Sequence, residues 1–497
     1  MPFSSKGAAA PYRLSTKLSL FNIHHSLFPP IPLPYSLSPM SGFSFQSLTL
    51  RQEIGANSYA LTLGDETIIL DAGMHPKEEG DDAIPRFQEI KFDTADAIVI
   101  SHSHLDHIGT LPVAQREHPS CPVYLTAGCA ALGEALLHNS INVMTSQATE
   151  LDIPSYPLFH HREVDYLKDN WMLRDYERPF PLNYDKDEST QVTFFDAGHI
   201  LGSAGILFER NKKSIFYTGD VHFHDHALIK GARFPDLVEP DVLIMETTRG
   251  IDERPGGNIK PKEAERLANN IKRTLEDGGS VLIPVFAIGK TQEVLTMLDG
   301  FKMDGIIPEK TPIIIGGLST KMTILYDSLA RQTRRTRPGF QILKDMDVIT
   351  GSKKRSREPI EYKPGAIYCL SSGMMSEKTV SNIFAREFLP NPLNSLLFVG
   401  YADPATPAGK IKKASTGDLI RLDGTHKVPL NCAVDEFDFS GHAHRDELLD
   451  FAVNMRPKKI LLVHGDPPAT AWFKEQLQDK LPNTKVIIPM PQVKIEL

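Results

Sequence analysis

Three histidines and an aspartate lie within six consecutive residues, and this segment constrains the fold more than any other part of the chain. The segment, His102 to His107, reads HSHLDH and directly follows the apolar run 97–100. Such a run predicts a buried strand, so the histidines sit on the loop that leaves it. Alternation points His102 and His104 to one side, while Asp106 and His107 turn to the other as a helix begins. Zinc prefers neutral imidazoles and carboxylates, so this loop offers ligands to two metal ions.

One local pattern recurs along the chain: a short apolar run, a small or turn residue, and then an isolated histidine or acid. The polar groups placed in this way are Asp71, His199, Asp220, Glu246 and His464. Each pattern predicts a buried strand that carries a polar group at its C-terminal end, where α/β folds gather their sites. One acid after a strand is usually a turn former or a helix cap. Because the pattern recurs beside a histidine-rich loop, it predicts a shared metal site.

The motifs together resemble those of the metallo-β-lactamase superfamily, specifically its β-CASP branch of nucleic-acid hydrolases. The segments that carry the resemblance are Asp71 to Pro76, His102 to His107, His199, Asp220, Glu246 in Met-Glu-Thr-Thr, His442 in Phe-Ser-Gly-His and His464 in Val-His-Gly. The segments 278–287 and 372–375 resemble parts of the β-CASP cap. The resemblance extends from about residue 48 to the C-terminus. It is strongest with the RNA-cleaving members, such as the endonuclease subunit of the cleavage and polyadenylation machinery and its prokaryotic relatives.

This resemblance implies an α/β fold, namely a four-layer αβ/βα metallo-β-lactamase sandwich interrupted by an inserted α/β β-CASP cap domain. The expected divisions are a disordered N-terminal extension over 1–47, a first sandwich part over 48–250, the β-CASP domain over 251–438 and the completing part over 439–497. The site motifs agree with an insertion, since they fall into two groups separated by a long stretch without any. Within that stretch, Lys262 to Leu275 predicts an amphipathic helix and Val281 to Val285 a buried strand.

The resemblance also implies the roles of the site residues. One zinc would bind His102, His104 and His199, the second would bind Asp106, His107 and His464, and Asp220 would bridge the two. The metal pair would activate a water as the nucleophile, with Asp106 and Asp220 taking part in catalysis as ligands. His442 would protonate the leaving oxygen or clamp a phosphate oxygen, Glu246 would orient His442, and Asp71 would fix a ligand histidine. Weaker candidates for substrate contact are Ser372, Gly373, Met374 and Lys410.

Two residues depart from the pattern of that branch. Arg249 stands where an aromatic residue is expected, and His444 follows the motif around His442 where aspartate or serine is more usual. Neither is an expected metal ligand. The departures therefore concern contacts to substrate rather than the binding of zinc.

The function implied by the resemblance is a zinc-dependent ribonuclease with two zinc ions per chain. Its expected substrate is RNA, preferably single-stranded, and the expected process is RNA 3′-end processing or turnover. A DNA-processing β-CASP nuclease is an alternative, but such members typically lack a histidine at the position of His464. A non-catalytic RNA-processing scaffold is another, but all seven ligands are present here. Endonuclease or exonuclease action, the RNA recognised, and membership in a homodimer or an RNA-processing complex stay open.

Composition limits the remaining choices. The net charge of −8 argues against non-specific nucleic-acid binding by the whole surface. Three basic clusters are candidates for a local patch that tracks phosphates, or else are solvated faces: Arg331, Arg334, Arg335 and Arg337; Lys353, Lys354, Arg355 and Arg357; and Lys410, Lys412 and Lys413. His222, His224 and His226 lie just after Asp220, and we interpret them as loop residues because seven ligands already complete two zinc shells.

The first residues differ from the rest of the chain. Residues 1–47 hold basic residues, many serines and several prolines but no acid, which predicts disorder. Their bias also fits an organelle transit peptide, and a true start at Met40 rather than Met1 is the alternative. No apolar stretch has the length of a membrane span. The four cysteines lie beside apolar residues without Cys-x-x-Cys spacing, which favours free thiols in a reducing compartment, and so the cytoplasm.

Overall fold

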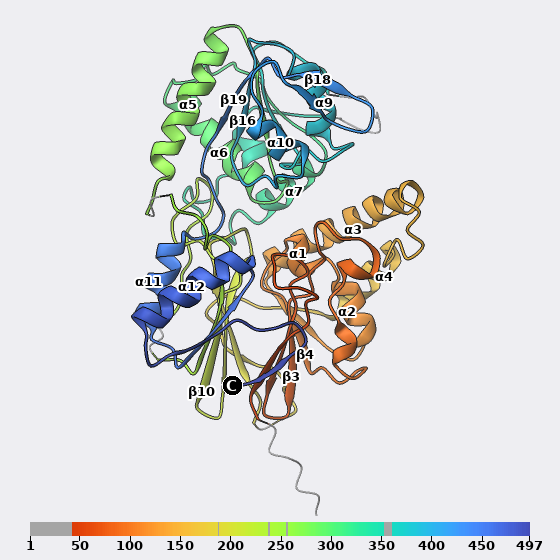
Figure 1. Cartoon of the computed structure of the whole chain (residues 1–497), viewed down its shortest axis with the longest axis vertical. Coiled ribbons are helices and arrows are strands. Elements are labelled where there is room, and N and C mark those ends of the chain that lie inside the picture. Colours follow the sequence, from red (N-terminus) through yellow and green to blue (C-terminus); the bar gives the residue numbers. More distant parts are fainter. Residues whose placement is uncertain (1–41, 187, 237–238, 255–256, 352–359) are drawn as a thin grey trace, which may run out of the picture. The chain divides into compact units, whose positions relative to one another are not determined.

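The two sheets of the sandwich face each other across an apolar core. The structure is a computed structural model that describes residues 42–186, 188–236, 239–254, 257–351 and 360–497 (Figure 1). The core between the sheets contains Phe45 and Leu61 from one sheet and Phe194 and Ile244 from the other. Burial of these side chains on both inner faces, at about 25 cal/mol per Å² of apolar surface, stabilises the pairing of the sheets.

Within the described residues, each of these sheets has seven strands. The first sheet runs in the order β22 (Lys494–Glu496), β1 (Ser44–Ser47), β2 (Tyr59–Leu63), β3 (Glu66–Leu70), β4 (Ala97–Val99), β5 (Val123–Leu125) and β6 (Trp171–Leu173). The second runs in the order β21 (Lys485–Ile487), β20 (Lys459–Val463), β11 (Val242–Glu246), β10 (Lys213–Tyr217), β9 (Ala204–Arg210), β8 (Gln191–Asp196) and β7 (Phe180–Pro181).

Helices cover the outer face of each sheet. The first sheet is covered by α1 (Leu105–Ile108), α2 (Leu111–Glu117) and α3 (Ala127–Glu150), and α4 (His161–Leu167) packs on α3. The second is covered by α11 (Arg445–Met455) and α12 (Pro467–Lys480), which lie side by side (Figure 1). Short 3₁₀ turns occur at η1 (Gly80–Ala83), η2 (Phe87–Glu89) and η3 (Lys168–Asn170). The order of layers is therefore helix, sheet, sheet, helix, as the sequence predicts.

A third sheet, parallel throughout, forms the core of the inserted part. Its described strands run in the order β14 (Val348–Thr350), β13 (Ile313–Ile315), β15 (Ile367–Leu370), β12 (Val281–Pro284), β16 (Ser395–Phe398) and β19 (Ala433–Glu436). One face is covered by α5 (Lys260–Glu276), α6 (Lys290–Met303), α7 (Leu318–Ser328) and α8 (Ile342–Asp345). The other is covered by α9 (Val380–Phe388), α10 (Pro407–Lys413) and the hairpin β17 (Leu419–Arg421) and β18 (Lys427–Pro429).

The helix and strand predicted inside the insertion are confirmed as α5 and β12. Leu267 and Ile271 lie four residues apart on the buried face of α5, which is the spacing of one face of a helix. Gly278 follows with a φ of 81°, a left-handed conformation that glycine adopts without strain. A Cβ at Gly279 would lie 1.8 Å from the carbonyl oxygen of Leu393, so only glycine fits where the chain turns into β12.

The strands that precede the site motifs are also confirmed, and their directions explain why the motifs meet. β3 pairs in parallel with β4, and β11 pairs in parallel with both β10 and β20. Parallel neighbours end at the same edge of a sheet. The carboxyl ends of these strands therefore place their loops together at one end of the sandwich.

The expectation of disorder through residue 47 is wrong for its last part. Ser44–Ser47 form β1, which pairs with β2 and β22, and Phe45 is fully buried in the core between the sheets. This strand has only four residues and one large apolar side chain, so the sequence pattern did not distinguish it from the serine-rich segment before it. Residues 1–41, and the basic cluster at 353–357, lie outside the described residues. The domain boundaries at 250 and 438 stay predictions.

No helix in the described ranges has the length and apolar character needed to cross a membrane.

Truncation at two points tests the role of β1. Removal of residues 1–47 takes away Phe45 and a central strand, and we expect it to lower the free energy of unfolding by about 3 kcal/mol or more, the usual cost of losing a buried phenylalanine. Removal of residues 1–39 leaves β1 in place and serves as the control, with an expected change below about 0.5 kcal/mol. Urea denaturation measures both. Equal stability of the two truncated proteins would contradict this role for Phe45.

Candidate metal centre

The predicted metal ligands come from loops that follow four strands and converge in one buried place. His102 to His107 follow β4, His199 lies in the turn after β8, Asp220 follows β10 and His464 follows β20. His464 has a φ of 48°, a left-handed conformation that is uncommon for a residue other than glycine. Strained conformations of this kind are held by their surroundings and often occur at functional sites.

One set of ligands consists of three histidines. His104 Nδ1 lies 3.2 Å from His102 Nε2 and 3.0 Å from His199 Nε2. Asp220 Oδ2 lies 3.5 Å from His102 Nε2 and 3.7 Å from His199 Nε2. These four ligand atoms lie within 4.8 Å of one another. This set matches the first zinc site inferred from the sequence.

The second set contains Asp106, His107 and His464. His464 Nε2 lies 3.2 Å from Asp106 Oδ2 and 3.4 Å from His107 Nε2. The other oxygen of Asp220, Oδ1, lies 3.5 Å from His107 Nε2 and 3.1 Å from His464 Nδ1. Asp220 therefore directs one carboxylate oxygen toward each set, which is the placement a bridging ligand requires.

Metal ions fit this arrangement. Asp220 Oδ1 is buried and has no hydrogen-bond partner among the described residues, and an unpaired buried carboxylate oxygen is costly unless a cation neutralises it. Burial lowers the pKa of His102, His104 and His199, that of His104 to about 4, so these imidazoles are neutral. Neutral imidazole nitrogens that converge at about 3 Å form a donor set that zinc accepts.

Asp71 contacts His107 of the second set on the side of its ring away from the other ligands. It follows β3, has a φ of 58° and is completely buried. Its Oδ2 lies 2.8 Å from His107 Nδ1 and accepts a hydrogen bond of 2.7 Å from the Tyr217 hydroxyl. Ser101 donates to both oxygens of the carboxylate, through its backbone N–H and its hydroxyl. With His107 Nδ1 fixed in this way, Nε2 is the nitrogen left to face a metal.

His442 and Glu246 form a pair beside Asp220. His442 Nδ1 lies 3.0 Å from Glu246 Oε2, which also accepts a hydrogen bond from the Thr248 hydroxyl. Burial lowers the pKa of His442, but the charges of Glu246 and Asp220 outweigh burial and raise it to about 9. The His442 side chain is 22% exposed, whereas that of His464 is 3% exposed. His442 is therefore more accessible to a substrate than His464 is.

The backbone and neighbouring side chains orient the remaining ligands. The Gly441 carbonyl oxygen lies 2.7 Å from His199 Nδ1, and the Thr248 hydroxyl lies 3.0 Å from His464 Nδ1. Asn57 donates a hydrogen bond to the backbone oxygen of Asp106. The sequence reasoning missed these contacts, together with Ser101 and Tyr217. Thr248 and Ser101 could have been suspected because each lies within two residues of a motif, but nothing in the sequence points to Asn57.

The weaker substrate candidates lie in the inserted part. Gly373 packs against Phe286, and the Met374 sulfur accepts a hydrogen bond from the backbone N–H of Asp403. Ser372 lies in the same loop after β15, and Lys410 is exposed on α10. All four residues thus belong to the inserted part, and their contact with substrate stays a prediction.

The first basic cluster is engaged within the protein. Arg335 is buried and donates to the backbone oxygens of Tyr326 and Phe340. Arg334 pairs with Asp196 at 3.0 Å, and Arg337 pairs with Asp299. These contacts favour a structural role for the cluster over a patch that tracks phosphates.

The three histidines after Asp220 do not join the ligand sets. His224 pairs with Glu447, and His226 Nδ1 lies 3.1 Å from Glu293 Oε1. The His222 side chain packs on His226, with ring centroids 4.4 Å apart. This agrees with the interpretation of these residues as loop residues near the centre.

Three family models match successive parts of the chain. They describe a metallo-beta-lactamase superfamily domain at residues 60–244, a Beta-Casp domain at 291–411 and a Zn-dependent metallo-hydrolase RNA specificity domain at 427–489. The chain belongs to the β-CASP branch of the metallo-β-lactamase superfamily. The resemblance inferred from the motifs and the fold class are therefore confirmed. A zinc-dependent family implies that the clustered ligands hold metal ions, and the number of two zinc ions stays a prediction.

Curated relatives of this β-CASP protein include larger proteins. The chain is 28% identical to endoribonuclease ysh1 of Aspergillus fumigatus over 494 residues, covering 91% of this chain and 55% of that protein. It is 27% identical to endoribonuclease ysh1 of Schizosaccharomyces pombe, covering 90% and 58%. It is 29% identical to transcription termination factor FttA of Pyrococcus abyssi, covering 84% and 65%. The chain thus spans little more than half the length of the two fungal relatives.

A solved structure agrees with the fold. The crystal structure of a protein of unknown function from Enterococcus faecalis V583 superposes with a TM-score of 0.53 at 13% sequence identity. The match covers 92% of this chain and 100% of that chain. At this identity the likeness extends to the fold alone.

The metal content follows from the two ligand sets. We expect the purified protein to carry about two zinc ions per chain, because each set provides three side chains and Asp220 serves both. Elemental analysis of protein from zinc-supplemented growth measures this number. Protein without metal under these conditions would contradict the proposed centre.

Asp71 offers a test of the support behind the ligands. Asp71→Asn places an amide among groups that already donate to this position, so we expect the affinity for the metal at the second set to fall about 10–100-fold. Tyr217→Phe is the control, since it removes one donor but keeps the carboxylate against His107, and it should change affinity less. Zinc release to a chelator, followed over time, compares the two variants. Equal release would show that Asp71 does not orient His107.

Proposed function

We propose that this chain is a metal-dependent hydrolase that cleaves phosphodiester bonds of RNA. The observation that carries the proposal is the placement of His442 beside Asp220, the carboxylate that faces both ligand sets. His442 Nδ1 lies 3.9 Å from Asp220 Oδ2 and 3.0 Å from Glu246 Oε2. A reachable, protonated histidine next to a two-metal centre is the arrangement that hydrolysis of a phosphodiester needs.

Bound zinc ions would supply a nucleophile at neutral pH and neutralise charge on the phosphorus. The residues of the chain perform the remaining tasks. Glu246 accepts the proton of His442 Nδ1, so Nε2 is the nitrogen left for the substrate. Burial lowers the pKa of His442, but without bound metal the charges of Glu246 and Asp220 raise it to about 9, which favours an imidazolium with a proton on Nε2. It therefore donates to the leaving oxygen or holds a phosphate oxygen, while Glu246, fixed by Thr248 and by the backbone N–H of Val221, orients it.

The comparisons support RNA as the substrate. The C-terminal part matches an RNA specificity domain, and the fungal relatives are named endoribonucleases. We propose that this chain likewise acts on RNA, most readily on a single strand that can reach His442. Free, buried cysteines support the cytoplasm as the location.

Two alternative functions remain, and the site argues against both. A DNA-processing nuclease of this branch typically lacks a histidine at the position of His464, which here lies 3.1 Å from Asp220. A non-catalytic scaffold would have lost ligands, whereas both sets are complete in this structure.

Incubation with end-labelled RNA and DNA decides between these functions. We expect the RNA to be cleaved, the DNA to be cleaved much more slowly, and both reactions to stop when a chelator removes the metal. Product lengths distinguish endonuclease from exonuclease action. Equal cleavage of DNA would support the first alternative, and intact RNA in the presence of zinc would support the scaffold.

His442 and His464, the two site histidines nearest the C-terminus, have distinct expected roles. His464→Ala should lose about one zinc and all activity, because His464 completes the second ligand set. His442→Ala should retain both zinc ions yet cleave RNA about 10²–10⁴-fold more slowly, the usual contribution of a general acid. Metal content and cleavage rate are measured on both variants. Loss of zinc from His442→Ala with retention in His464→Ala would reverse the assignment, and normal cleavage by His442→Ala would contradict the mechanism.

A further inference from the structure

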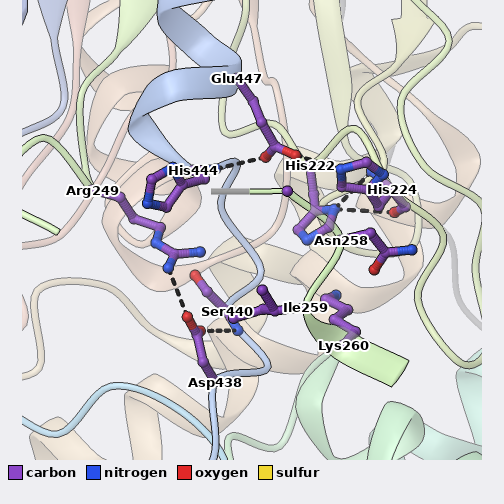
Figure 2. Close-up of a pocket in the computed structure, with 11 residues that line it drawn as sticks. His222, His224, Arg249, Asn258, Ile259, Lys260, Asp438, Ser440, His444 and Glu447 are labelled. Atoms are coloured by element: carbon purple, nitrogen blue, oxygen red, sulfur yellow. Dashed lines mark hydrogen bonds and ion pairs between the residues drawn. The ribbon is translucent and has the colours of Figure 1, made fainter. Parts of the chain in front are cut away.

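A pocket lies beside the metal centre, and neither the proposed mechanism nor the ligand sets use it. Its lining includes His222, His224, Arg249, Lys260, Ser440 and His444 (Figure 2). The pocket is partly open to solvent. Both residues in which the sequence departs from its branch, Arg249 and His444, line this pocket. The two residues that differ from the pattern of the branch therefore lie in the same pocket.

The pocket is joined to the centre by two short pieces of chain. His222 is two residues from Asp220, and His444 is two residues from His442. Two extended residues span at most about 7 Å. A group bound in the pocket therefore lies close to a substrate phosphate at the metal centre.

His444 lines the pocket and carries an unpaired donor. It is 4% exposed, and its Nε2 has no hydrogen-bond partner among the described residues. Its Nδ1 accepts a hydrogen bond of 3.2 Å from the backbone N–H of Asp446. A nitrogen that accepts a hydrogen bond carries no proton, so the ring proton is on Nε2. A buried N–H without an acceptor is energetically unfavourable, and an acceptor atom of a bound ligand would satisfy it.

The other lining groups also favour an acceptor. The Ser440 hydroxyl is a donor. The two cations are already paired, Arg249 with Asp252 and Asp438 and Lys260 with Glu293. The two acids of the lining are already engaged: Asp438 accepts from Arg249 and from the backbone N–H of Ser440, and Glu447 contacts His224 and accepts from the backbone N–H of His444. The donors that remain are the N–H of His444 Nε2 and the Ser440 hydroxyl, and they suit an acceptor such as a phosphate oxygen rather than a metal cation.

We propose that this pocket binds a backbone phosphate of the RNA strand, adjacent to the phosphate that is cleaved. The proposal rests on the proposed function for its source of phosphate, since an oxyanion held next to His442 keeps the strand in register with the centre. Free inorganic phosphate has the same chemistry, and the experiment separates the two sources.

His444→Ser is the test variant. Serine caps a helix well, and with Glu447 three residues later it preserves the capping box at the start of α11. The variant thus removes the imidazole donor while keeping the helix. His426→Ser is the matched control, since His426 is exposed on the β17–β18 hairpin. Thermal melting and zinc content should match the unsubstituted protein for both variants.

Binding of inorganic phosphate is read first, from the histidine Cε1–H signals in NMR spectra of the full-length protein. The signal missing from His444→Ser identifies His444, and the signal missing from His426→Ser identifies the control. We expect phosphate to shift the first signal and not the second. This readout does not depend on cleavage. No shift of the His444 signal, or loss of a zinc ion from His444→Ser, would overturn the proposal.

RNA is the second probe. A series of short single-stranded RNAs, each with one neutral methylphosphonate linkage, is bound in the His442→Ala background, where the strand stays intact. At one position we expect the neutral linkage to weaken binding about tenfold, the value of a charge-assisted hydrogen bond, and to have little effect when His444→Ser is also present. The same loss at that position in both backgrounds would overturn RNA as the source. Failure of the unsubstituted protein to cleave RNA would contradict the proposed function alone.

Discussion

The structure depends on one carboxylate with a histidine set on either side. Asp220 Oδ2 lies near His102 and His199, and Oδ1 lies near His107 and His464. Because a carboxylate is short, both sets must come within a few ångströms of the same point. That requirement fixes how the two sheets of the sandwich meet, because each set combines ligands from the loop after β4 of the first sheet with a histidine from the second sheet. The histidine is His199, after β8, in one set and His464, after β20, in the other.

Parallel pairing satisfies this requirement. β10, β11 and β20 end in register at one edge and deliver Asp220, Glu246 and His464 from neighbouring strands. The backbone then adapts at single residues, with positive φ at Asp71 and His464. The sheets hold the strand ends rigidly, and the residues with positive φ orient the ligand side chains. Because only a few residues are strained, at about 1–3 kcal/mol each, the cost of assembling the site is small.

The sequence predicted the ligands because each follows an apolar run, and burial makes that pattern visible. The layers, by contrast, were implied by the resemblance to the metallo-β-lactamase superfamily. The sequence did not predict Asn57, the Gly441 carbonyl or the pairing of Arg249 with Asp438, because these contacts join residues that are distant in sequence and have no local pattern. The start of the fold was placed too late, since β1 is short and follows a serine-rich segment. Local patterning reveals which residues are buried, whereas contacts made through loops need the tertiary structure.

Glu246 ends β11, before the helices and strands of the inserted part, and His442 lies a few residues after β19, so the proposed catalytic pair lies at the two connections. The returning segment is held from the inserted side: Lys290 donates to the backbone oxygen of Phe439, and Glu263 accepts from the backbone N–H of Asp438. Arg249 then ties the two connections together through Asp438. One metal ligand also depends on this segment, because the Gly441 carbonyl oxygen lies 2.7 Å from His199 Nδ1. Displacement of α6 would therefore move both His442, the proposed general acid, and the carbonyl that orients His199, whereas Asp106, His107 and His464 are held by other contacts.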